Sequence, residues 1–157
     1  MADRKPPRLE GDERATLMGL LQYQRESLVR KVGGVTAAQA AWSPVPSGTN
    51  LLWLVTHMAD AEESWVVRRF AGLSTDVGEE PPEVDAVGHA VAQYRAMWAT
   101  VDGLVVAADG LDEPCRGEET IPAVTLRWVL THLLEETARH AGHADIIREL
   151  IDGAVGR

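Results

Sequence analysis

Residues 125–152 read TLRWVLTHLLEETARHAGHADIIRELID, and this stretch decides the fold class of the chain. Its length and periodicity predict one long amphipathic helix, with Val129 and Ile147 on the face that points into the protein. Gly153 follows directly, at the position where helices commonly end. The stretch therefore predicts a helix with one inward face.

Three more helical patterns precede it, over about residues 12–32, 49–71 and 84–107. In the connector between the first two, Thr36 can cap a short helical turn. No segment has a convincing strand pattern. Helices of about 20 residues are about 30 Å long, and four of them predict an all-α fold, a four-helix bundle whose natural order is antiparallel. The loops exceed the minimum length, so connections that cross over the end of the bundle remain an alternative.

The 157 residues are the length of one domain. Residues 1–10 are charged and proline-containing, and we expect a flexible arm there. We expect residues 11–157 to form a single bundle domain. Polar stretches with proline and glycine at 74–83 and 109–123 predict loops.

Composition excludes several classes of function. Fifteen basic and 24 acidic residues give a net charge of −9, which argues against nucleic acid and against an anionic membrane surface as partners. No apolar run approaches the length of a membrane span, and the N-terminus lacks the pattern of a signal peptide. Cys115 is the single cysteine, in keeping with a reducing compartment. We therefore expect a cytoplasmic protein.

Ligand-type side chains gather on one face of the last helix. At 100° per residue, the four side chains fall within a wedge of about 80°, and they are His132, Glu136, His140 and His143. His57 lies in the middle of the second helical pattern, on a face shared with apolar residues. An inward histidine that faces a His/Glu stripe on another helix predicts a metal site in the bundle core.

The residue types fit that chemistry. Imidazole nitrogen and carboxylate oxygen suit zinc and other first-row divalent ions. Glu136 and His140 have the i, i+4 spacing that brings two ligands to one ion, as do His132 and Glu136, and His57 would supply a third ligand. Three protein ligands leave positions open for water or substrate, as in catalytic sites. Alternatively, Arg127, Arg139 or a protonated histidine pairs with Glu136, because an inward carboxylate needs a partner.

Residues next to His57 have simpler interpretations. Asp60, Glu62 and Glu63 are most simply a solvated face, although Asp60 could orient His57 from behind. The five tryptophans stand at helical spacings, which predicts core positions or the lining of an apolar pocket. Cys115 lies in a loop with no histidine near it in sequence, so we expect an exposed thiol and not a nucleophile.

Two segments carry a family resemblance: LLWLVTHMADAEESW at 51–65 and HLLEETARHAGHADIIREL at 132–150. They closely resemble the DinB-like superfamily and, more narrowly, its actinobacterial branch that includes mycothiol S-transferases. The resemblance covers about residues 10–155. It implies a four-helix bundle with a three-ligand metal site, and position by position the ligands are His57, Glu136 and His140. His143 falls where many relatives carry glutamine, which implies a supporting or pocket residue, and His132 would be a pocket residue or a fourth ligand.

The resemblance also implies a function. Similar maleylpyruvate isomerases use glutamate at position 136 but carry an additional C-terminal domain, so this shorter chain is more similar to the S-transferases. We therefore expect a metal-dependent enzyme that activates a low-molecular-weight thiol, mycothiol, for attack on an electrophile. Zinc is the expected ion, with nickel or iron as alternatives. Two other readings stay open, a hydrolase that uses metal-bound water and a non-enzymatic metal-binding helical dimer. A homodimer is expected in any case.

Overall fold

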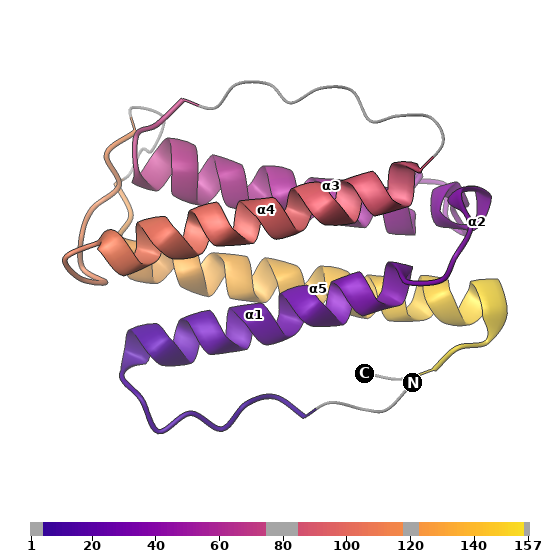
Figure 1. Ribbon diagram of the computed structural model, residues 1–157, viewed down its shortest axis with the longest axis horizontal. Coiled ribbons are helices and arrows are strands. Elements are labelled where there is room, and N and C mark those ends of the chain that lie inside the picture. The colour runs from indigo at the N-terminus through magenta and orange to yellow at the C-terminus, as the bar shows by residue number, and fades with distance from the viewer. Residues whose placement is uncertain (1–4, 75–84, 118–122, 156–157) are drawn as a thin grey trace.

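The computed structural model describes residues 5–74, 85–117 and 123–155. Its helices are α1 (Glu13–Val32), α2 (Ala37–Ala41), α3 (Leu51–Glu62), η1 (Glu63–Phe70), α4 (Ala86–Ala107) and α5 (Leu126–Asp152). Because η1 continues α3 without a break, four long rods make the bundle, with short α2 at one end (Figure 1). The prediction of an all-α four-helix bundle is confirmed. In the part of the chain that the structure describes, no helix is long and apolar enough to cross a membrane.

The rods pack as two pairs, α1 against α5 and α3 against α4. In Figure 1, α1 and α5 run in one direction, and α3 and α4 run in the opposite direction. The helices of each pair are therefore parallel, and the fully antiparallel order expected from the sequence is wrong. The reason is loop length. The 15 residues from 71 to 85 can span about 50 Å when extended, more than the roughly 33 Å of the 22-residue helix α4.

Polar side chains set the starts of the helices. The side chain of the residue before the first turn accepts a backbone N–H at Asp12, Thr36, Asn50 and Asp85. Each of these caps satisfies a donor that the helix itself leaves free. At the end of α5, Gly153 adopts the left-handed conformation with φ 73°. The predicted bounds therefore hold within two residues, except that the predicted start at Val84 lies outside the described residues.

Some expectations concern segments that are described only in part. The arm over residues 1–10 is described from Lys5, with no helix before Glu13. Of the two predicted loops, residues 75–83 and 118–122 lie outside the described residues. In the described part of the second loop, an isolated antiparallel bridge joins Pro114 to Thr125.

The second rod changes its hydrogen bonding halfway along. Segment η1 is a π-helix, and its end is marked by the i→i+5 bond from Ala71 N–H to the Val66 carbonyl at 2.9 Å. Such widened turns are frequent at functional sites. Val66, Val67 and Phe70 point into the core from η1. No pattern of residues predicts this change, because the α and π forms share the same residue types.

A polar layer crosses the bundle at mid-length. Arg25 of α1 is buried and donates to both carboxylate oxygens of the buried Glu62, at 2.8 and 2.6 Å. Its third nitrogen reaches Asp102 of α4 at 2.8 Å, and the Tyr94 hydroxyl donates to Glu62 at 3.2 Å. The expectation that Glu62 belongs to a solvated face is therefore wrong. A buried carboxylate needs a charged partner, and that partner comes from a helix 37 residues away in sequence.

Candidate metal centre

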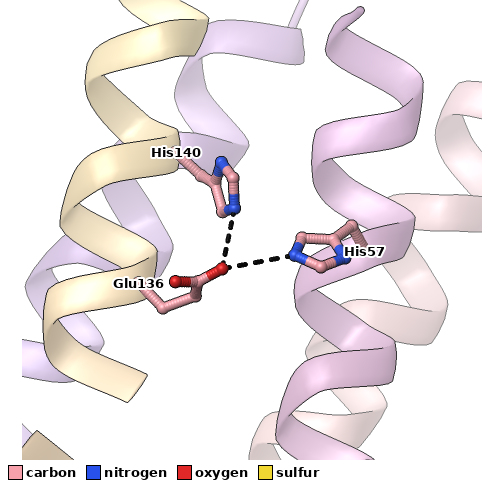
Figure 2. A group of neighbouring side chains, drawn as sticks. All are labelled: His57, Glu136 and His140. Carbon is pink, nitrogen blue, oxygen red and sulfur yellow. Dashed lines mark hydrogen bonds and ion pairs between the residues drawn. The ribbon is translucent and has the colours of Figure 1, made fainter. Parts of the chain in front are cut away.

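Three ligand-type side chains meet between α3 and α5 in this same layer. Figure 2 shows Glu136 and His140 reaching from one turn of α5 toward His57 on α3. The Glu136 Oε1 atom lies 3.1 Å from His140 Nε2 and 3.4 Å from His57 Nε2. One ligand atom from each residue lies within 4.8 Å of the other two. The structure therefore brings together the three residues that the resemblance selected.

Neighbouring side chains fix the orientation of His57. The Trp53 ring, one turn earlier on α3, stacks on the His57 imidazole with 4.6 Å between centroids and 6° between planes. The His140 ring meets the His57 ring edge-on at 4.9 Å. Asp60 borders the same pocket as His57, but no hydrogen bond joins these two described side chains. No direct hydrogen bond therefore supports the expectation that Asp60 orients His57.

The Glu136 carboxylate is divided between two environments. Its Oε1 atom faces the two histidines, and its Oε2 atom contacts the half-exposed Arg139. Partial burial raises the pKa of Glu136, but the hydrogen bonds to His57 and His140 and the charge of Arg139 outweigh it, so that this pKa lies below its ordinary value. Arg127, the other cation considered for this role, pairs instead with Glu13 and Asp112. Glu136 is thus an anion with one oxygen free for the centre.

His143 contacts the opposite side of the His140 ring. The two Nδ1 atoms lie 3.4 Å apart, so one of them has to carry the proton that the other accepts. With a cation bound, Nδ1 of His140 would donate to His143, and Nε2 would keep the lone pair that a metal ligand needs. Burial lowers the pKa of His140, which favours the neutral ring.

The donor set fits a divalent cation. Two imidazole nitrogens and one carboxylate oxygen converge on one point, and this combination suits zinc, nickel and iron. Without a cation, the Oε1 atom of Glu136 must accept hydrogen bonds from both the His57 and the His140 rings. Three protein ligands leave at least one coordination position open. His57, Glu136 and His140 are thus suited to hold such an ion.

A cavity of about 300 Å³ is lined by two members of the triad, His57 and Glu136. Trp65, Arg68 and His132 also line it. His132 is therefore a pocket residue. It lies outside the group of described His, Cys, Asp and Glu residues whose ligand atoms converge.

An aromatic cluster lies beside the pocket, and its Trp65 lines the cavity, in keeping with the expectation that tryptophans are core or pocket lining. His132 stacks on Trp128 at 5.0 Å between centroids, and Trp65 meets both rings, at 4.8 and 5.0 Å. The i, i+4 spacing of Trp128 and His132 was visible in the sequence as a stacking pair. Trp65 comes from η1 across the bundle, so its place beside them depends on the tertiary structure.

Cys115 is not part of this site. Its side chain is half-buried against the apolar cluster that also contains Leu111. Burial raises the pKa of the Cys115 thiol, and the charge of Arg69 opposes that shift only in part. The expectation of an exposed thiol is thus wrong, and the thiolate form that a nucleophile requires is disfavoured.

Comparisons with known proteins agree with this architecture. The mycothiol-S-transferase family model matches residues 16–153. Among solved structures, the chain is similar to the crystal structure of a conserved protein from Enterococcus faecalis, with 17% identity and a TM-score of 0.68 over 92% of this chain and 99% of the other. At that identity the likeness concerns the fold alone. No curated protein matches. Because the family match runs from α1 to the end of α5, the chain belongs to the mycothiol-S-transferase family.

Proposed function

We propose that this protein is a metal-dependent S-transferase that joins mycothiol, a low-molecular-weight thiol, to an electrophilic small molecule. The convergence of His57, Glu136 and His140 beneath an open pocket is the observation that carries the proposal. Family membership supports a thiol S-transferase-like role. The metal dependence, the identity of the thiol and a cytoplasmic location are parts of the proposal.

In this proposal the three residues hold a divalent ion, with zinc as the first candidate. Such an ion would supply a positive charge that lowers the pKa of a bound thiol, so that thiolate forms at neutral pH. His140 and Glu136 are in the neutral and anionic states that ligation requires, given the lowered pKa of each. His143 holds the His140 ring in place through their Nδ1 contact.

In this proposal a carboxylate on the pocket wall accepts the proton that the thiol releases. Asp60 lines the pocket, and partial burial together with the nearby charge of Glu63 raises its pKa above the ordinary value. A carboxylate with a raised pKa is a better acceptor for the proton that a thiol releases. No protein side chain acts as the nucleophile in this scheme, which agrees with the half-buried position of Cys115.

Conjugation kinetics test the proposal. Purified protein with zinc, mycothiol and a model electrophile should form the thioether faster than the uncatalysed reaction, and His140→Ala should lose at least about tenfold of that rate. Losing a residue that only supports a ligand typically costs 10–100-fold, and losing the ligand itself should cost no less. Glu135→Gln is the matched control, since Glu135 is the exposed neighbour of Glu136 and lies outside the triad. Equal rates for His140→Ala and Glu135→Gln would refute the proposal.

The same preparation separates the alternatives. Turnover of an ester or amide without thiol, abolished in His140→Ala, would indicate a hydrolase that uses metal-bound water. Fewer than about one metal ion per several chains, with a melting temperature that a chelator does not change, would indicate a non-enzymatic helical module. Both outcomes contradict S-transfer.

A further inference from the structure

The aromatic cluster beside the triad has exposed surface that no protein group covers. Trp128 is 45% exposed, although its ring stacks on His132 and meets Trp65. Trp65 and His132 line the cavity that opens onto His57 and Glu136. Tryptophans that serve only the core bury their rings, whereas these rings leave a partly open face next to a candidate reaction centre.

Arg69 fixes Trp65 in this position. Its guanidinium lies 4.4 Å from the centroid of the Trp65 ring, and the same group contacts the Ser64 hydroxyl. A cation over one face of an indole ring stabilises the position of that ring. The Trp65 ring is therefore held by Arg69 within η1 and by His132 and Trp128 of α5.

We propose that the wall formed by Trp65 and His132, with Trp128 packed beside them, binds a planar aromatic ring of the electrophile, and that the protein prefers aromatic electrophiles to aliphatic ones. This inference rests on the proposed S-transfer. A ring stacked on Trp65 inside the cavity lies next to the open side of the triad, where the thiol sulfur would be held. Aromatic rings attract one another in stacked and edge-on arrangements beyond what area burial gives.

The size and polarity of the cavity fit this ligand. Its volume of about 300 Å³ is at the lower end of the range for small-molecule pockets, which suits one ring-sized reactant and not both reactants together. Arg68 is the half-exposed cation at its edge, and its ion pair with Glu63 is long, at 3.8 Å. A carbonyl or another electron-rich substituent on the ring can therefore accept from Arg68 at little cost.

Two unsaturated ketones test the preference with one chemistry. In 4-phenylbut-3-en-2-one and pent-3-en-2-one, the thiolate sulfur adds to the β carbon, the C=C π bond breaks, and the α carbon takes the proton that the thiol released. The substrates differ only in a phenyl or a methyl group at the β carbon. Each enzymatic rate is divided by the uncatalysed rate with the same ketone, so that intrinsic reactivity cancels. We expect the wild-type protein to prefer the phenyl ketone.

Variants assign the preference to the wall. Trp65→Leu keeps apolar volume but removes the ring, and it should lower the phenyl-to-methyl ratio of kcat/KM by about fivefold. Trp65→Phe should restore the ratio to within about twofold. Trp42→Leu is the control, because it makes the same change at a tryptophan that caps the end of α2 and does not line this cavity. Equal ratios for Trp65→Leu and Trp42→Leu overturn the proposal.

A binding measurement keeps this test separate from the proposed reaction. The saturated ketone 4-phenylbutan-2-one cannot accept a thiol, and calorimetry without thiol should give a Kd about fivefold weaker for Trp65→Leu than for wild type. If neither unsaturated ketone is conjugated but this difference holds, S-transfer to such ketones fails while the aromatic subsite stands. If conjugation proceeds but the Kd is unchanged, the subsite fails alone.

Two other occupants of the wall are outcomes of the same experiments. If Trp65→Leu raises the KM for mycothiol equally with both ketones and leaves their ratio unchanged, the thiol and not the electrophile occupies the wall. If Trp128→Ala converts a dimer to a monomer in sedimentation and leaves the ratio unchanged, the cluster is a contact between two copies of the chain. Either result overturns the proposal.

Discussion

At the residue scale, the site depends on how one carboxylate is shared. Oε1 of Glu136 faces both imidazoles, and Oε2 contacts Arg139. The salt bridge considered from the sequence as an alternative to a metal is therefore present, but it uses only one of the two oxygens. An exposed ion pair of this kind contributes little to stability. The other oxygen stays available to the centre.

The lowered pKa of His140 makes the stability of the metal-free protein dependent on pH. Burial holds this pKa below the ordinary value, which is about 6.5. Between these two values the unfolded chain binds more protons than the folded one, so the free energy of unfolding should be constant above pH about 6.5 and fall as the pH drops through that window. One group contributes at most about 1.4 kcal/mol per pH unit.

Urea denaturation of chelator-treated protein between pH 8 and pH 5 measures this slope. His140→Gln has no imidazole at this position and should have a shallower slope than wild type. Identical slopes for the two proteins would show that His140 does not titrate with folding.

At the element scale, the π-helical segment η1 explains how one rod serves both the core and the pocket. Val66, Val67 and Phe70 are buried, whereas Ser64, Trp65 and Arg68 line the cavity. The loop after α4 supports η1 from outside, because Gly117 N–H donates to the Arg69 carbonyl at 2.8 Å and Arg116 N–H to the Phe70 carbonyl at 3.1 Å. The pocket wall therefore depends on a backbone contact between two elements.

Gly117 is required for that contact. A Cβ atom at this position would lie 2.5 Å from the Arg68 carbonyl oxygen and 3.0 Å from Arg69 Cα. We expect Gly117→Ala to lower the free energy of unfolding by about 1–3 kcal/mol, the usual cost of overpacking. Gly110→Ala, in the same loop with no atom within 4 Å of its Cβ, should change it by less than about 1 kcal/mol. Urea denaturation compares the two variants, and equal stability would contradict the close approach.

At the scale of the whole molecule, polar side chains occupy one layer between two apolar clusters. One cluster contains Leu28 and Met58, and the other contains Leu21 and Val66. Along α1 and α3, the Arg25–Glu62 pair lies between residues of the two clusters. Along α5, Glu136 and His140 likewise lie between core residues of the two clusters. Breaking such a buried pair typically costs about 3–5 kcal/mol. The contacts of Arg25 join α1, α3 and α4 at mid-length.

Because the triad joins α3 to α5, ion binding should stabilise the whole bundle. Zinc at 100 times its Kd should add about 2.7 kcal/mol, which raises the melting temperature by about 5–10 °C for a chain of this size. His57→Ala should lose this increase, since it removes the ligand on α3, whereas Glu135→Gln should keep it. Differential scanning calorimetry with and without zinc provides the measurement. An increase that persists in His57→Ala would contradict a site between the two helices.

The expected homodimer stays a prediction. The apolar stripe of α4 is used inside the protomer, where Tyr94, Trp98, Val101 and Val105 are buried. A dimer would have to use another face, and the sedimentation experiment on Trp128→Ala examines one of them.

The sequence by itself determined the helices and the face of ligand-type side chains on the last of them. Helical periodicity and capping chemistry act within a few residues, so Thr36 and Gly153 marked helix ends without any knowledge of the fold. The stripe of Glu136 and His140 is likewise local to one helix. Choosing these two over His132, with His57 as the third, depended on family resemblance.

Only the tertiary structure decided what depends on the packing of distant elements. The direction of each rod follows from loop length and from burial of its stripe, so the antiparallel order was wrong. The sequence predicted a solvated Glu62, because its partner Arg25 comes from another helix. The contacts of Trp65 with the Trp128 and His132 rings likewise require η1 to face α5. These contacts join residues dozens of positions apart, and no local pattern in the sequence encodes which surfaces will meet.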